Sequence, residues 1–150
     1  AVFKAGHPAL KLDPLALRQG SQTSEQVMQW FEGHHHQGPL MVYATDHPEA
    51  VRRCQEELGV ERAGMLVEQT FAEIARAAVT LGVTRFIVAG GETSGAVVQA
   101  LGIKAIKIGA PIAPGVPVTQ TLGDKPLLLA LKSGNFGDRD FFAKALTMMR

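Results

Sequence analysis

The stretch that most constrains this chain is residues 85–95, where an apolar run meets a pair of glycines. Residues 86–89, Phe-Ile-Val-Ala, include β-branched members and are typical of a strand buried on both faces. The glycine pair 90–91 ends this run abruptly. Thr93 or Ser94 can then cap a helix that follows, so the sequence predicts a strand, a glycine turn and a helix start in direct succession.

Such a turn has two interpretations. A helix start directs free backbone N–H groups and the positive end of the helix dipole at one spot, which suits a phosphate. The same two glycines can also serve only to make a tight connection between strand and helix. Residues 85–95 alone leave both interpretations open.

Two known phosphate-binding motifs can be tested against this turn, and neither matches. Gly90 and Gly95 have the spacing of a P-loop, but Ala96 and Val97 stand where the motif requires lysine and a hydroxyl residue. The dinucleotide pattern Gly-x-Gly-x-x-Gly is also absent, and the next predicted strand ends at 109–110 without an acid to hold a ribose. A phosphate site here would therefore have to differ from both of these motifs.

A second glycine-rich turn follows another predicted strand. Residues 127–131 form an apolar run, and Lys-Ser-Gly-Asn-Phe-Gly follows before a helix expected from about Asp138. Gly134 and Gly137 allow the backbone to approach a ligand closely. Since ligands of open α/β sheets bind at such strand ends, the two turns are expected to form one site. Lys132 could add positive charge to it, although a solvated surface lysine is the more ordinary interpretation.

Five segments together resemble the C-terminal nucleotide-binding domain of the four-carbon acid sugar kinases, and among these most of all the 3-oxo-tetronate 4-kinases. They cover nearly the whole chain: 7–14, 59–64, 88–98, 113–117 and 131–137. The resemblance implies that ATP is bound by backbone at Gly91, Glu92, Thr93 and Ser94, with Gly134 opposite. Val118 departs from the family pattern, which usually has tryptophan after Gly-Val-Pro.

The resemblance also implies what accompanies this domain. ATP and Mg²⁺ are the expected cofactors, and the phosphate acceptor is expected to be a four-carbon acid sugar. Residues 1–150 are then a single nucleotide-binding domain, the C-terminal fragment of a longer two-domain kinase. An N-terminal domain outside this chain is expected to hold most of the sugar, so the fragment alone should be inactive. No catalytic base and no metal-ligand set can be named from the sequence.

Two other functions compete with a kinase domain. A non-catalytic nucleotide or phosphate sensor would use the same glycine turns, and nothing in the sequence separates it from a kinase. A small dehydrogenase-like domain is weakened by the failed dinucleotide pattern. His47 and Asp138 are the only polar candidates near strand ends, and each has an ordinary explanation as a helix cap.

Composition narrows the choice of partners and compartment. A length of 150 residues suits one domain, and a formal net charge of +1 gives no reason to expect nucleic acid or an anionic membrane as a partner. The single cysteine, Cys54, cannot form an internal disulfide, which favours a reducing compartment and hence the cytoplasm. Neither a signal peptide nor an apolar stretch of membrane-spanning length is recognised. A homo-oligomer is left open.

The order of elements predicts an α/β fold. Apolar runs alternate with helical patterns, which favours a three-layer α/β/α sandwich around a largely parallel sheet, with room for one antiparallel strand. Strands are expected at 9–13, 39–45, 86–89, 105–109 and 127–131, and helices from Ser21 or Thr23, from 46–48, at 62–81, at 96–101 and from Asp138. Residues 110–123, with three prolines, are expected to be a long irregular segment, either a binding loop or a solvated connection.

Three further features have a possible chemical role and a simpler alternative. Residues 34–36 are consecutive histidines, but three sequence neighbours rarely reach one metal ion, so a polar loop is favoured. Asp46 could bind Mg²⁺ at a strand end, although capping the next helix is the simpler role. Cys54 lies within a predicted helix and is expected to be a neutral thiol facing the core.

Overall fold

The computed structural model describes residues 6–134 and 138–150. Helices separate the earlier strands as expected, whereas the last three described strands follow one another without a helix between them. The elements are β1 (Ala9–Lys11), α2 (Pro14–Gln19), α3 (Ser24–His34), the 3₁₀ helix η1 (His35–Gln37), β2 (Met41–Tyr43), α4 (Pro48–Leu58), α5 (Val60–Thr80), β3 (Arg85–Ala89), α6 (Gly91–Ala100), β4 (Ile106–Ala113), β5 (Val116–Thr121), β6 (Leu128–Lys132) and α7 (Phe141–Met148).

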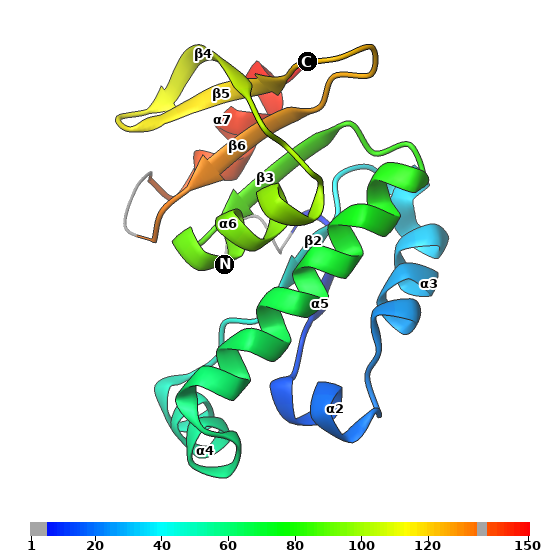
Figure 1. Ribbon diagram of the computed structural model, residues 1–150, viewed down its shortest axis with the longest axis vertical. Coiled ribbons are helices and arrows are strands. Elements are labelled where there is room, and N and C mark those ends of the chain that lie inside the picture. Colours follow the sequence, from blue (N-terminus) through cyan, green and yellow to red (C-terminus); the bar gives the residue numbers. More distant parts are fainter. Residues whose placement is uncertain (1–5, 135–137) are drawn as a thin grey trace.

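The described strands form two sheets rather than one (Figure 1). β1 and β2 make a two-stranded parallel sheet, and the other four strands make a mixed sheet in the order β3-β6-β5-β4. β3 and β6 are parallel, whereas β5 is antiparallel to both of its neighbours. The α/β class is confirmed, and β5 is the one antiparallel strand for which the sequence left room.

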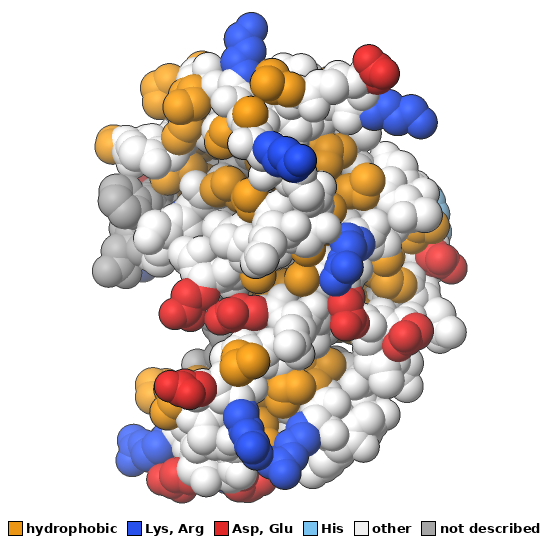
Figure 2. All heavy atoms as spheres, viewed as in Figure 1, with side chains coloured by type: hydrophobic (Ala, Val, Ile, Leu, Met, Phe, Trp, Pro, Cys, Tyr) orange, Lys and Arg blue, Asp and Glu red, His pale blue; other side chains and the backbone are white. Residues whose placement is uncertain are grey.

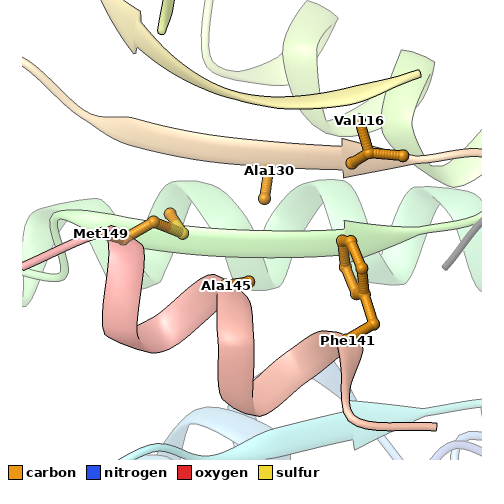
Figure 3. Packing of buried hydrophobic residues seen from close by; sticks show 5 residues of the cluster. All are labelled: Val116, Ala130, Phe141, Ala145 and Met149. Carbon is orange, nitrogen blue, oxygen red and sulfur yellow. The ribbon is translucent and has the colours of Figure 1, made fainter. Parts of the chain in front are cut away.

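Helices cover both faces of the four-stranded sheet. On one face, Phe141 and Ala145 of α7 and Met149 at its C-terminal end pack against Val116 of β5 and Ala130 of β6, all with at most 1% of their surface exposed (Figure 3). On the other face, Val88 of β3 packs against α5 and α6. β6 therefore lies at the centre of the domain, and its side chains alternate between the two helix layers.

Helix α5 also joins the two sheets. Phe71 packs against Leu12, Val27 and Ile74 in the cluster around β1 and β2, and against the cluster of α5, α6 and β3. At 21 residues α5 is the longest element, and Figure 1 shows it running across the molecule. It begins at Val60, two residues before the expected start, and Leu81 of the predicted apolar stripe is exposed rather than packed.

Local capping explains how the N-terminal helices begin. Thr23 accepts a hydrogen bond from the backbone N–H of Gln26, and the Gln26 side chain accepts one from the N–H of Thr23. This reciprocal pair is a capping box, and it settles the predicted choice between Ser21 and Thr23. Asp13 caps the short helix α2, an element that the sequence did not predict, by accepting from the N–H of Leu15.

The prediction that residues 110–123 form an irregular segment is wrong, because most of these residues belong to the hairpin of β4 and β5. Pro114 and Gly115 make its two-residue turn, with φ of +78° at the glycine, as a type II turn requires. A bulge between Ile108 and Pro111 accommodates a proline in the strand. A Cβ at Gly109 would lie 3.0 Å from the carbonyl oxygen of Val118, so a side chain there would collide with β5.

The surface in Figure 2 carries basic and acidic side chains interspersed, in keeping with the net charge of +1. Apolar side chains gather over the part of this face formed by β4 and β5. In the described residues no helix combines the length and the apolar character that crossing a membrane requires.

The central position of β6 gives a stability prediction. Leu129→Ala removes a side chain that is 0% exposed, so it should lower the free energy of unfolding by roughly 2–5 kcal/mol. Leu122→Ala, at a residue that is 68% exposed, is the matched control and should change it by less than about 0.5 kcal/mol. Urea unfolding followed by circular dichroism measures both. Equal effects of the two substitutions would contradict the central packing of β6.

Candidate functional site

The first glycine turn has the predicted order of strand, turn and helix, but its cap differs from the prediction. Gly90 is the N-cap of α6, with φ +113° and ψ 132°, and no side chain caps the helix. Thr93 and Ser94, predicted as caps, lie instead within the first turn of α6. A Cβ built on Gly90 would lie 3.4 Å from the Thr93 hydroxyl. Glycine is required here mainly because its φ is one that side chains disfavour.

The start of α6 presents backbone donors that have no acceptor among the described residues. The N–H of Ser94 donates to the carbonyl of Gly90 at 2.9 Å, which is the first bond of the helix. The N–H groups of Gly91, Glu92 and Thr93 precede this bond, and no side chain accepts a capping hydrogen bond from them. Ser94 differs from them: its amide is used, but its hydroxyl is buried with no hydrogen-bond partner in the described part of the chain.

The second glycine turn is tied directly to the first. The N–H of Gly90 donates to the carbonyl of Lys132 at 2.7 Å, which joins the ends of β3 and β6. The Lys132 ammonium donates to the carbonyl of Gly134 at 2.9 Å and lies 5.9 Å from the centre of the Phe141 ring. Lys132 therefore folds over its own turn and keeps a positive charge there, rather than extending into solvent. Gly137, the other predicted glycine of this turn, falls outside the described residues.

A cavity of about 1170 Å³ connects the two turns. Gly90 and Thr93 from the first turn line it together with Lys132 and Gly134 from the second. These four residues thus bring the ends of β3 and β6 to one place, as the sequence analysis expects. Gly91 and Glu92 are exposed beside them at the start of α6, and neither lines the cavity.

Two carboxylates near strand ends are already engaged. Asp138 lines the cavity, and a hydrogen bond from the Lys144 ammonium holds the pKa of its carboxyl below the ordinary value. Asp138 is therefore ionised near neutral pH. Asp46 is ion-paired with Lys11, which lowers its pKa in the same way, and it accepts from the N–H of His47. The predicted cap at Asp46 is wrong, since His47 is the N-cap of α4.

The other candidates have structural roles. His34 and His35 belong to the end of α3 and to η1 rather than to a loop; their ring nitrogens hydrogen-bond to the carbonyls of Trp30 (2.7 Å) and Glu32 (2.9 Å). No cluster of three potential metal ligands occurs among the described histidine, cysteine and acidic side chains. Cys54 is 7% exposed, and burial raises the pKa of its thiol, so it is a neutral core residue as expected.

Sequence reasoning missed the way in which Lys132 is held. The lysine was interpreted mainly as a solvated charge, whereas it is half-buried between its own turn and Phe141 of α7. Phe141 follows the second turn by only a few residues and belongs to an apolar helix face. An aromatic residue placed just after a lysine-glycine turn is the signal that could have indicated this contact.

The geometry of the first turn gives a prediction for two neighbouring glycines. Gly90→Ala forces a side chain onto a backbone with φ +113°, and should lower the free energy of unfolding by roughly 1–3 kcal/mol. Gly91→Ala should leave it unchanged within about 1 kcal/mol, because Gly91 is helical and a Cβ there meets no atom within 4 Å. Denaturant unfolding measures both. Equal destabilisation would mean that α6 does not begin at Gly91.

Proteins of known name share much of this sequence. The protein is 56% identical over 147 residues to the 3-oxo-tetronate kinase of Cupriavidus necator, and 54% identical over 146 residues to that of Pseudomonas fluorescens. These matches cover 98% and 97% of this chain and 34% of each relative. The chain therefore spans about a third of the length of these relatives.

Solved structures share the fold closely. The Haemophilus influenzae protein HI1011 superposes with a TM-score of 0.91 at 41% identity, over 99% of this chain and 36% of that protein. A protein from Bordetella bronchiseptica, solved as a domain-swapped dimer with bound citrate, has a TM-score of 0.73 at 22% identity and so supports the fold alone. The family model described as the nucleotide-binding C-terminal domain matches residues 1–142. The chain belongs to this family of nucleotide-binding C-terminal domains.

Proposed function

We propose that the two glycine turns bind the phosphates of ATP. The observation that carries this proposal is the start of α6, where the amides of Gly91, Glu92 and Thr93 precede the first helical bond and receive no side-chain cap. Backbone donors at a helix start, with the helix dipole behind them, favour an anionic group. Family membership supports a nucleotide as the source of that anion.

Each of the other groups at the turns has a role in this proposal. Lys132 supplies a positive charge that the Gly134 carbonyl and the Phe141 ring hold in place. Gly134 is exposed, and a Cβ there would meet no atom within 4 Å, so a ligand can approach its backbone closely. The buried Ser94 hydroxyl is an unused donor within the same helix turn. Phosphoryl transfer depends on such positioning and on charge neutralisation more than on covalent chemistry.

Mg²⁺ is expected to accompany the nucleotide. It neutralises phosphate charge and usually keeps several waters, so it needs only one or two carboxylates from a protein. Glu92, exposed in the first turn of α6, and Asp138, ionised at the cavity, are the acids of this chain that suit it.

A dinucleotide cofactor suits this site less well than ATP. Rossmann-type sites use an acid at the end of a neighbouring parallel strand to hold a ribose. The strand next to β3 is β6, which ends in Lys132 and a glycine turn, and the next strand along the chain, β4, belongs to an antiparallel hairpin. No carboxylate therefore follows at the position that this recognition requires.

For the whole protein we propose a kinase that phosphorylates the terminal hydroxyl of a four-carbon acid sugar, such as a 3-oxo-tetronate. The names of the relatives support this reaction. Since this chain spans about a third of their length, the sugar is proposed to bind mainly to an N-terminal domain outside these residues.

Gly91→Val tests the nucleotide site. The added side chain occupies open space beside the free amides, where the phosphates would lie, so the dissociation constant for MgATP should rise roughly ten- to hundredfold. The fold should persist, because a Cβ at this position meets no atom within 4 Å. Isothermal titration with MgATP, and with NAD for comparison, measures the affinities, and circular dichroism checks the fold.

Gly95→Val is the matched control, one helical turn further along α6, where a Cβ also meets no atom within 4 Å. It should leave the affinity for MgATP within about twofold of the unchanged protein, because the amide of Gly95 comes after the first helical bond and is not one of the uncapped donors. Equal affinity of the two variants would show that the turn is only structural. Tight binding of NAD without binding of ATP would contradict the choice of nucleotide.

The two-domain arrangement makes a separate prediction about turnover. This chain alone should release no measurable ADP with a 3-oxo-tetronate, even when ATP is bound, because nothing holds the acceptor in line. Such positioning is worth roughly 7–11 kcal/mol. Adding the N-terminal two-thirds of the Cupriavidus necator relative in trans should restore turnover, as a coupled assay of ADP can measure. Robust turnover by this chain alone would show that its own residues bind the sugar.

A further inference from the structure

Beyond the glycine turns, the cavity extends between the two sheets and is bounded on two sides by strand edges. Residues 40–45 around β2 line one side of it, and residues 84–90 around β3 line the other. Both β2 and β3 are terminal strands of their sheets among the described elements. The volume of about 1170 Å³ exceeds the range of roughly 300–1,000 Å³ that is usual for small-molecule pockets.

The edge of β3 that faces the cavity carries backbone groups for which no described strand supplies a partner. On its other side, the carbonyl of Thr84 accepts from Leu128 (2.8 Å) and the N–H of Gly90 donates to Lys132 (2.7 Å). Alternate residues of a parallel strand use their N–H and C=O groups on the same side. Arg85, Ile87 and Ala89 therefore direct theirs away from β6, toward the cavity.

β2 presents the same kind of edge from the opposite side. The N–H of Met41 donates to Pro8 (3.0 Å), and the carbonyl of Tyr43 accepts from Leu12 (2.7 Å), so both residues are paired toward β1. Val42 lies between them and directs its N–H and C=O groups away from β1, toward the cavity. No described strand pairs with either of these two edges. Unpaired backbone groups in an apolar setting cost free energy, so an occupant that pairs them is favoured.

The other two sides of the cavity are apolar helix faces. Phe71, Ile74 and Ala78 of α5 lie on one side, and Phe142 and Leu146 of α7 contribute on the other. An occupant must therefore offer backbone donors and acceptors on two opposite edges and apolar side chains on its two faces. A β-strand with apolar residues on both faces has these properties, and a nucleotide does not.

We propose that this cavity, between the open edges of β2 and β3, receives one additional β-strand and so joins the two sheets into one. The strand is assigned to the part of the polypeptide outside residues 1–150, because this chain spans about a third of the length of its relatives. α5 is already in place across the junction, since Phe71 packs with both sheets. This proposal concerns assembly of the fold and holds whether or not the turns bind ATP.

Hydrogen exchange tests the proposal directly. The sample is this chain alone, compared with a chimera that joins it to the N-terminal two-thirds of the Cupriavidus necator relative. The amides of Val42, Ile87 and Ala89 should exchange rapidly in the chain alone and at least roughly 100-fold more slowly in the chimera, because a paired strand amide exchanges only on local opening. The amide of Gly90, already bonded to Lys132, should change far less.

A pair of proline variants gives a second measurement. Ala89→Pro removes an N–H that faces the cavity, so it should lower the thermal unfolding midpoint of the chimera more than that of the chain alone. Val88→Pro is the control, since its N–H faces β6 and its loss should lower both midpoints alike.

The outcomes separate the possible occupants. Protection of the edge amides in the chimera, with the proline difference, supports the proposal. Edge amides that exchange equally fast in both proteins would overturn it. Protection in the chain alone would also overturn it: if it increases with protein concentration the occupant is a second copy, and if it does not the two edges are closed within the chain.

Discussion

The hydrogen bond from the Gly90 N–H to the carbonyl of Lys132 fixes the relation between the two glycine turns. It extends the pairing of β3 and β6 one step past the end of β3 and holds both chain reversals at the same edge of the sheet. Because Gly90 is also the N-cap of α6, the same residue sets where the helix starts and which way its free amides point. The site thus depends on one backbone contact between two strands that lie far apart in the sequence.

The parts of the fold that were predictable are those set by local chemistry. The strand-glycine-helix order at 85–95 was correct because an apolar run and two glycines leave few alternatives. The capping residue was not predictable from preference alone. Thr93 and Ser94 are good caps, but the backbone reverses at Gly90, and both hydroxyl residues then fall inside the helix. Asp46 was assigned as a cap for the same reason, whereas Lys11, distant in sequence, recruits its carboxylate.

The hairpin of β4 and β5 could not be predicted, because it forms through pairing between strands and not through local sequence preference. Three prolines and two glycines in 109–117 indicate irregular backbone, and these residues become strands only because β4 and β5 pair with each other and β5 pairs in turn with β6. The buried Thr119 hydroxyl, which donates to the carbonyl of Leu129 at 2.9 Å, shows how closely β5 depends on its neighbour. The placement of Lys132 over Phe141 was missed for a similar reason, since α7 had to be positioned first.

The bulge and proline of β4 also distinguish the two outer edges of the four-stranded sheet. β4 is the outermost strand on its side, and its Ile108 is 71% exposed, so a regular backbone there would invite pairing with another molecule. The irregular register at Ile108 and Pro111 interrupts the row of donors that such pairing needs. β3, at the opposite edge, has no such interruption. The irregular edge of β4 therefore disfavours pairing with another molecule, whereas the regular edge of β3 can accept a further strand. Any strand added to this sheet is expected at β3 and not at β4.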